Sequence, residues 1–226
     1  FINCQWTKYF DLKKLENDVY EEADKIVALS PGIKEQIEAL RPEKQIEIIP
    51  NMSDIDFFKP EKKNPELEHL FGTKGKFVIS YFGAIGRANH LEFLLTAANE
   101  ALKNNLPILI LIIGEGSELP RLKHLVKHLN ITNIKFMPFQ SKYNLKRALN
   151  VTDAAYVSFA SKPIMETNSP NKFFDALAAG KLIITNTKGW VKEVIEVGDC
   201  GFYYNPEKPE SFVGKIGPYL ANTSIL

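Results

Sequence analysis

The chain has 226 residues, long enough for one or two domains with a buried core. Its 28 lysines and arginines nearly balance its 27 aspartates and glutamates, so no strong overall field attracts nucleic acid or an anionic membrane surface. The two cysteines, Cys4 and Cys200, lack the spacing of a metal or redox site and fit a reducing compartment such as the cytoplasm.

The first 60 residues predict a small α/β segment that cannot close a core by itself. Its expected elements are helices at residues 11–23 and 31–40 and strands at residues 25–29 and 47–49. Residues 61–75 are rich in Lys, Glu and Pro, which is typical of a linker. We therefore predict the remnant of one domain at residues 1–60, a linker at 61–75 and a compact domain at 76–226.

In the compact domain, short β-branched runs alternate with longer amphipathic stretches, as in βαβ units. Strands are expected at residues 77–82, 108–113, 134–137, 154–159, 182–185 and 201–204. Helices are expected at about residues 91–103, 117–129, 144–150, 170–179 and 190–196, and from residue 209 onward. The pattern predicts an α/β fold with a doubly wound parallel sheet.

The longest apolar run, residues 106–113, is far too short to span a bilayer, and no signal peptide is visible at the start. The chain begins at Phe1 rather than at a methionine, and Leu226 does not close a recognisable element. We therefore expect the chain to be part of a longer cytoplasmic protein.

The segment around Lys172 predicts an anion site at the start of a helix. Ser169 is a suitable cap and Pro170 a suitable first helical residue. The backbone N–H groups of Asn171 and Lys172 would then point outward at the positive end of the helix dipole. Asp175 lies about one turn further along the same face, within reach of a ribose beside a bound diphosphate. Taken alone, the segment also fits an ordinary capped helix.

Two glycine-rich loops follow the first two strands of the compact domain. In the first, Gly83 and Gly86 would let the backbone approach a ligand, and Arg87 would fork onto phosphate oxygens. A plain glycine turn with a solvated arginine remains an alternative. In the second, Ser117 is expected to cap a helix whose first turn is acidic, so we interpret residues 114–118 as structural.

Phe139 follows the third strand, and its ring could stack on a flat base beside exposed main-chain groups. Packing within the loop is the alternative for this residue. Because ligands of doubly wound sheets lie at the carboxyl ends of the strands, these loops should converge. A base slot, phosphate donors and a hydroxyl-binding acid together predict a nucleotide site.

Nearly the whole chain resembles the retaining glycosyltransferases of the GT-B architecture, in the family 4-like group that includes sucrose synthase and bacterial mannosyltransferases. The ordered landmarks are residues 23–30, Ile49 to Asn51 with Asp54, Gly83, Gly114, Gly116, Phe136, Asp153 with Ala154, and residues 178–180. The resemblance implies two Rossmann-like domains, with the donor-binding domain from about residue 76 and the tail of the acceptor domain before residue 60.

The resemblance also assigns acids to the donor. Family members carry two acids eight residues apart, of which the second binds the ribose hydroxyls and the first contacts the transferred sugar. Asp175 matches the second acid, whereas Thr167 occupies the position of the first. Glu166, displaced by one residue, is the candidate for the contact with the sugar.

Positive charges are rearranged relative to the family. Ala84 and Asn89 occupy positions where members usually carry an arginine and a lysine. Arg87 and Lys172 are therefore the candidates for neutralising the diphosphate as the glycosidic bond breaks. The Ser-Pro-Asn-Lys motif ending at Lys172 resembles a subgroup that makes bacterial surface polysaccharides such as O-antigen and capsule.

The implied reaction moves a sugar, expected to be UDP-linked and an N-acetylated amino sugar, to a saccharide or lipid-linked acceptor with retention. The nucleotide sugar is a co-substrate, and no cofactor or metal is expected, although Asp54 and Asp56 spell a D-x-D motif. The acceptor would bind mainly to the other domain, so these residues alone should bind nucleotide with little transfer. Peripheral attachment of the whole protein to the inner face of the plasma membrane is compatible with this role.

Two other classes remain open. The first is a Rossmann module that binds NAD or another nucleotide for a different reaction, although the G-x-G-x-x-G fingerprint is missing. The second is a non-catalytic glycosyltransferase-like subunit, which the replacements at Ala84, Asn89 and Thr167 would suit.

Overall fold

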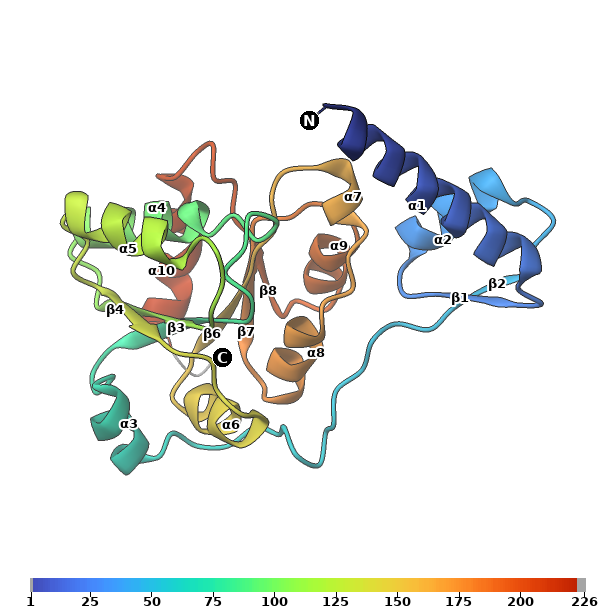
Figure 1. The fold of residues 1–226 in the computed structure, drawn as a ribbon. Coiled ribbons are helices and arrows are strands. Elements are labelled where there is room, and N and C mark those ends of the chain that lie inside the picture. The colour runs from blue at the N-terminus through green and yellow to red at the C-terminus, as the bar shows by residue number, and fades with distance from the viewer. Residues whose placement is uncertain (1, 223–226) are drawn as a thin grey trace.

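The computed structural model describes residues 2–222, with side chains described from residue 12 onward. A six-stranded sheet, in the order β5-β4-β3-β6-β7-β8, forms the centre of the larger unit, and all of its neighbouring strands are parallel (Figure 1). Its strands are β3 (Phe77–Phe82), β4 (Ile108–Ile113), β5 (Ile134–Met137), β6 (Ala154–Val157), β7 (Leu182–Thr185) and β8 (Gly201–Tyr203). The predicted doubly wound α/β fold is confirmed.

Apart from Ser80 and the hydroxyl of Tyr81, the central strands β3 and β4 are apolar, because helices cover both faces of the sheet. Every residue of β3 and β4 is buried, and the two strands pair in register from Phe77 with Ile108 to Phe82 with Ile113. Since alternate side chains point to opposite faces, each of these strands supplies two separate cores.

One face packs against α4 (Glu92–Lys103), α5 (Leu119–His128) and α10 (Ser211–Ala221). The other face packs against α6 (Lys142–Asn150), α8 (Asn171–Ala178) and α9 (Trp190–Val197) (Figure 1). The strand order reverses between β3 and β6, because the chain runs from β3 outward to β5 and returns to β6. This topological switch point is where ligands of such sheets bind.

The first part of the chain forms a smaller unit with its own two-stranded parallel sheet. Its elements are α1 (Ile2–Glu22), β1 (Ile26–Ala28), α2 (Pro31–Leu40) and β2 (Ile46–Ile48). Their core is small and is formed by Ile26, Ala28, Ile37 and Ile46. The four predicted elements are therefore present, with α1 beginning earlier than expected.

The structure places two further helices where none was predicted. Helix α3 (Pro65–Phe71) lies within the expected linker and packs on α6. It is capped by the side chain of Asn64 and ends at Gly72, which has a left-handed conformation (φ 63°). Helix α7 (Pro163–Glu166) is a single turn before α8. The expected cap at Ser117 is wrong, because α5 begins two residues later behind Glu118.

Within the described residues, no helix is both long enough and apolar enough to cross a membrane.

Candidate functional site

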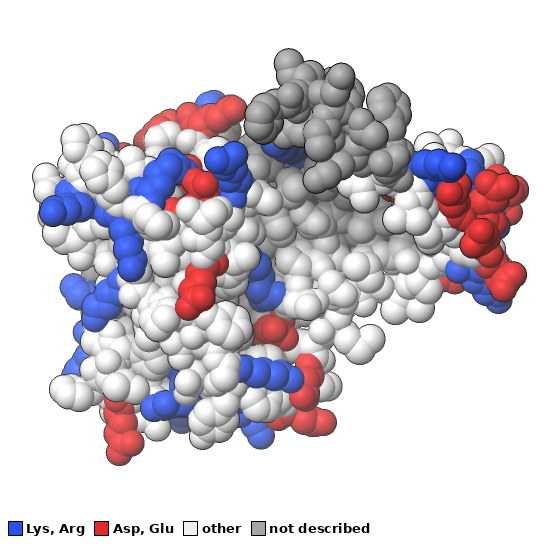
Figure 2. All heavy atoms as spheres, viewed as in Figure 1, with Lys and Arg blue, Asp and Glu red and all other residues white. Residues whose placement is uncertain are grey.

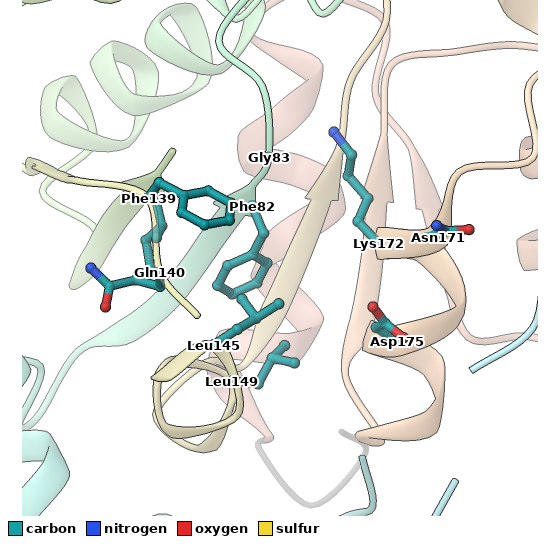
Figure 3. A pocket seen from close by; sticks show the side chains of 10 residues that line it. Phe82, Gly83, Phe139, Gln140, Leu145, Leu149, Asn171, Lys172 and Asp175 are labelled. Atoms are coloured by element: carbon teal, nitrogen blue, oxygen red, sulfur yellow. The ribbon is translucent and has the colours of Figure 1, made fainter. Parts of the chain in front are cut away.

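A cavity of about 280 Å³ lies at the switch point, beside the carboxyl ends of the central strands (Figure 3). The ends of β3 and β4, the loops after β3 and β5, and the helices α6 and α8 form its walls. Its lining consists of Phe82, Gly83, Ile113, Phe139, Gln140, Leu145, Leu149, Asn171, Lys172 and Asp175. Thus five candidate residues from the sequence, namely Gly83, Phe139, Asn171, Lys172 and Asp175, share one cavity.

The backbone after β3 turns at Gly83, where φ is 130° and a side chain would be strained. This turn lies directly against the loop after β4. A Cβ atom on Gly114 would fall 1.9 Å from the carbonyl oxygen of Gly83, and one on Gly116 would fall 2.2 Å from that of Ile85. The two loops therefore need glycines to pack together, and their contact fixes one wall of the cavity.

Helix α8 begins at Asn171 with Pro170 in the cap position. The predicted cap by Ser169 is wrong, because the Ser169 hydroxyl accepts a hydrogen bond from the Asn51 amide at 3.4 Å instead. Among the described residues, the amides of Asn171 and Lys172 have no hydrogen-bond acceptor. These N–H groups are therefore free for an anion at the positive end of the helix.

The Lys172 side chain extends from the start of α8 toward Gly83, whereas the Asn171 side chain points the other way (Figure 3). A Cβ atom on Gly83 would lie only 3.3 Å from the Lys172 Nζ. Burial lowers the pKa of Lys172 from 10.5 to about 8, so the ammonium form still predominates at neutral pH. The Lys172 ammonium thus lies beside the backbone of Gly83, where no side chain would block a phosphate from reaching it.

Asp175 lies one turn further along α8 and is half-buried. The Ser53 hydroxyl donates a hydrogen bond to its carboxylate at 2.7 Å. Burial raises the pKa of Asp175, while the Ser53 hydrogen bond and the charge of Lys142 act in the opposite direction. The carboxylate is therefore placed to accept hydrogen bonds from hydroxyl groups, and the Ser53 hydroxyl already donates one to it.

The wall opposite α8 is apolar. Phe139 is 70% exposed and lies near Phe82 at the edge of the cavity, while Leu145 and Leu149 from α6 form its floor (Figure 3). An exposed ring beside a leucine-lined surface is suited to a flat heteroaromatic group. Gln140 also lines the cavity, but its side-chain amide points away from Lys172 and Asp175 and donates to the Pro138 carbonyl at 3.0 Å (Figure 3).

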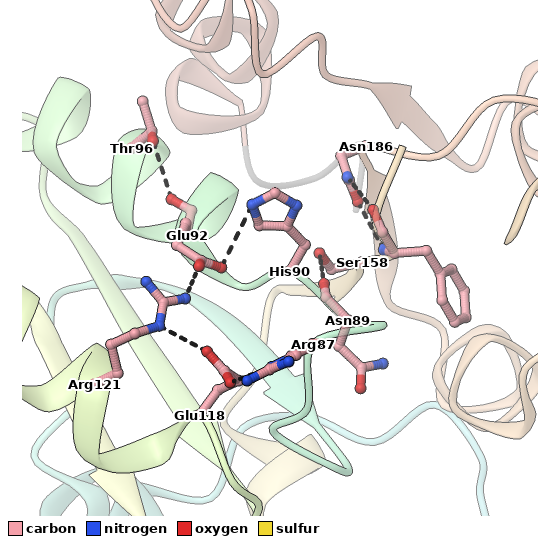
Figure 4. Close-up of polar contacts among 10 residues, drawn as sticks. Arg87, Asn89, His90, Glu92, Thr96, Glu118, Arg121, Ser158 and Asn186 are labelled. Atoms are coloured by element: carbon pink, nitrogen blue, oxygen red, sulfur yellow. Dashed lines mark hydrogen bonds and ion pairs between the residues drawn. The ribbon is translucent and has the colours of Figure 1, made fainter. Parts of the chain in front are cut away.

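Arg87 and Gly86 lie further out on the loop after β3 and do not line the cavity. The Arg87 side chain is 93% exposed and contacts Glu118 only at 3.4 Å. Glu118 is held more closely by Arg121, at 2.6 Å, and Arg121 also pairs with Glu92 on α4 (Figure 4). Arg87 is therefore a loosely held cation at the outer end of an ion-pair network.

Glu166 lies apart from Lys172 and Asp175, in a second cavity of about 210 Å³. This cavity is formed by the loops that follow β6, β7 and β8, and its lining is mostly polar. The Ser30 hydroxyl donates a hydrogen bond to the backbone carbonyl of the neighbouring Thr167 at 2.5 Å. The structure thus places Glu166, the candidate for the family's first acid, at the second cavity, and places Thr167, which occupies that acid's position, beside the smaller unit.

The D-x-D motif has a structural explanation. One Asp54 oxygen accepts the Phe57 amide at 3.0 Å, and the other pairs with Lys142 at 3.3 Å. Among the residues that the structure describes, no three His, Cys, Asp or Glu side chains gather in a group suited to a metal ion. Acidic and basic side chains are mixed over the face seen in Figure 2.

Sequence reasoning missed several residues of the site. Tyr81 is fully buried at the end of β3 and receives a hydrogen bond from Lys172. Asn51 and Ser53 reach the site from the segment between the two units. Leu145 and Leu149 have i, i+4 spacing on α6, a local signal that could have identified them. The contacts of Tyr81 and Ser53 join distant segments and carry no local signal.

The fold and the cavity define a doubly wound, Rossmann-like domain with a ligand-sized cavity at its switch point. The family model described as "Glycosyl transferases group 1" matches residues 64–224, well over half of the chain. The chain therefore belongs to the group 1 glycosyl transferase family.

A curated relative is spore coat protein SA of Bacillus subtilis (strain 168), which is 23% identical over 174 residues, 72% of this chain and 44% of that protein. Similar solved structures include Anabaena HepE in complex with UDP-glucose (TM-score 0.72, 17% identity, 89% of this chain and 55% of that one). Sucrose-phosphate synthase from Thermosynechococcus elongatus is another (TM-score 0.74, 18% identity, 93% and 52%). The fold is shared, and the chain spans about half the length of these relatives.

Proposed function

We propose that this chain is the donor-binding part of a retaining glycosyltransferase. The donor is a nucleoside-diphosphate sugar, with UDP as the nucleotide and an N-acetylated amino sugar as the transferred group. The acceptor is a saccharide or a lipid-linked molecule, and the reaction belongs to the synthesis of a surface polysaccharide. The observation that carries the proposal is the convergence of Lys172, Asp175 and the free amides of α8 in one cavity with Phe139.

The spacing of these groups suits the parts of UDP. The free N–H groups at the start of α8 and the Lys172 ammonium would bind the diphosphate. Asp175, one helical turn away, would accept the ribose hydroxyls. Phe139 and the leucines of α6 would receive the uracil ring on the opposite wall.

The same groups would also assist the reaction. As the glycosidic bond breaks, its electron pair moves to the β-phosphate oxygen, and negative charge grows on the departing UDP. Fixed positive charge at Lys172 and the helix amides would stabilise this leaving group more than the intact donor. Arg87, exposed on its loop, would reach the same phosphates only after moving away from Glu118. The scheme requires no metal ion.

Related structures support a UDP donor. HepE has been crystallised with UDP and with UDP-glucose, and Staphylococcus aureus TarM with UDP. Because the chain covers about half of HepE and 40% of TarM, the acceptor would bind largely outside these residues. We assign the whole protein to the cytoplasmic side of the membrane, peripherally attached where its lipid-linked acceptor lies.

Calorimetric titration with UDP, UDP-N-acetylglucosamine and NAD tests the proposal. We expect UDP and the UDP-sugar to bind at one site and NAD to show no heat of binding. Binding of NAD without UDP would point to a different Rossmann enzyme, and binding of none of the three would point to a non-catalytic subunit. A donor screen with the full-length protein, read by mass spectrometry, would then identify the sugar.

A further inference from the structure

Lys172 is held by a neutral aromatic partner rather than by an acid. Its Nζ donates a hydrogen bond to the Tyr81 hydroxyl at 3.0 Å and lies 4.2 Å from the centroid of the same ring. The Tyr81 hydroxyl in turn donates to the Ala84 carbonyl at 2.6 Å. Among the residues whose side chains are described, no carboxylate forms an ion pair with Lys172.

This chain of hydrogen bonds has a fixed direction. The ammonium can only donate, and the carbonyl can only accept, so the phenol must accept from Lys172 and donate to Ala84. Tyr81 itself is immobilised in the sheet, with no exposed surface. The start of α8 is thereby joined to the loop after β3, across the end of the cavity where both segments meet.

A lysine side chain otherwise has many rotamers, and a ligand that bound it would have to fix it at a cost in conformational entropy. An acid in the place of Tyr81 would also fix it, but would neutralise its charge. The phenol ring and hydroxyl restrict the ammonium without cancelling that charge. The full positive charge then remains available to a ligand.

We infer that Tyr81 is a positioning residue for the donor site, which holds the Lys172 ammonium beside Gly83 for an anionic diphosphate. The inference rests on the proposed function for the identity of the ligand. It concerns a contact that acts through Lys172, since Tyr81 itself does not line the cavity.

The test is Tyr81→Phe, which keeps the ring and removes the hydroxyl. The matched control is Tyr219→Phe. Tyr219 is a partly buried tyrosine on α10 that stacks on Phe202 and does not contact Lys172. The pH titration of the Lys172 Cε–Hε signals follows the charge of the ammonium, and the signals are assigned by their absence from Lys172→Met. Calorimetry with UDP at pH 7 gives the affinity of each variant.

We expect the Lys172 pKa to fall in Tyr81→Phe, because a hydrogen bond accepted from the ammonium favours its charged form. We expect the dissociation constant for UDP to rise about tenfold, as for one hydrogen bond to a charged group. Tyr219→Phe should change neither. An unchanged Lys172 titration, or an altered titration with unchanged UDP affinity, would overturn the inference.

A second measurement decides the matter should Tyr81→Phe fold poorly. In the unaltered protein, NMR relaxation should show the terminal methylene of Lys172 to be far more restricted than that of the exposed Lys215 on α10. Equal mobility of the two lysines would refute a positioning role. Failure of the unaltered protein to bind UDP would refute the proposed function instead, so the two failures are distinguishable.

Discussion

Replacing Lys172 with methionine should change stability and UDP affinity in opposite directions. Burial lowers the pKa of Lys172 from 10.5 to about 8. Keeping this side chain charged in the folded state therefore costs about 3 kcal/mol, at about 1.4 kcal/mol per tenfold change in proton affinity. Methionine removes the charge but keeps the length, and Tyr81 retains its bond to Ala84. We expect the free energy of unfolding at pH 7 to rise by about 1–3 kcal/mol.

The same substitution removes a charged donor from the diphosphate. A hydrogen bond to a charged group contributes about 1.5–3 kcal/mol, so the dissociation constant for UDP should rise by about tenfold to a hundredfold. A variant that becomes more stable and binds more weakly has lost a binding group rather than its fold.

The pH dependence provides a second signature. In the empty protein Lys172 loses its proton as the pH rises through about 8, so UDP affinity should weaken above that value. Between about pH 8 and 10.5 the unfolded chain retains a proton that the folded chain has released, so the Lys172 contribution to stability rises with pH. Both slopes should disappear in Lys172→Met.

Urea denaturation and calorimetry at pH 7 and pH 9.5 measure these effects, with Lys215→Met on α10 as the control at an exposed lysine. The control should leave stability within about 0.5 kcal/mol and UDP affinity unchanged. A Lys172→Met variant that is less stable at pH 7, or that binds UDP as tightly as the unaltered protein, would refute the reasoning.

Three further predictions concern other parts of the site. Asp175→Asn should weaken UDP binding about tenfold, as for hydrogen bonds to a charged group, but should barely affect 2′,3′-dideoxy-UDP; equal losses in calorimetry would contradict a ribose contact. Ser53→Ala should raise the pKa of Asp175, because the Ser53 hydrogen bond lowers it; a carboxyl-carbon NMR titration would reveal an unchanged value if that bond is unimportant. Gly114→Ala should destabilise the fold by more than about 2 kcal/mol, since its Cβ would meet the Gly83 carbonyl at 1.9 Å. Gly214→Ala lies in α10, where the added Cβ would meet no other part of the protein within 4 Å, and should stabilise the fold by about 0.5–1 kcal/mol; similar melting shifts for the two glycines would count against the close loop packing.

The strands of the sheet could be predicted because their signal is local. Residues 108–113 are a continuous apolar run, and residues 77–82 are apolar or aromatic except for Ser80. A glycine follows each run, and β3 and β4 have these bounds. Helix α3 was missed because its charged composition resembles that of a linker. Its start at Asn64 and Pro65 is nevertheless a standard helix signal. The charged composition of residues 61–75 therefore hid a helix-capping signal that the sequence contains.

The site was predictable where one segment contains it. Lys172 and Asp175 share a helical face by their spacing alone, and both line the cavity. Ser169 was assigned to the wrong partner, because its contact with Asn51 joins segments 118 residues apart. Likewise, Tyr81 lies 91 residues from Lys172, and the strand pattern marks it only as a buried aromatic. Such contacts depend on which distant segments the fold brings together, and a single sequence contains no direct signal for this.

The segment before β3 affects how this protein can be recombined with its relatives. Asn51 and Ser53 precede the family match, which begins at residue 64, yet they bond to Ser169 and Asp175 within it. A chimera joined between residues 61 and 75 would therefore take Asp175 from one parent and Ser53, which donates a hydrogen bond to the Asp175 carboxylate, from the other. Hybrid enzymes should keep donor specificity best when the crossover is placed upstream of Asn51.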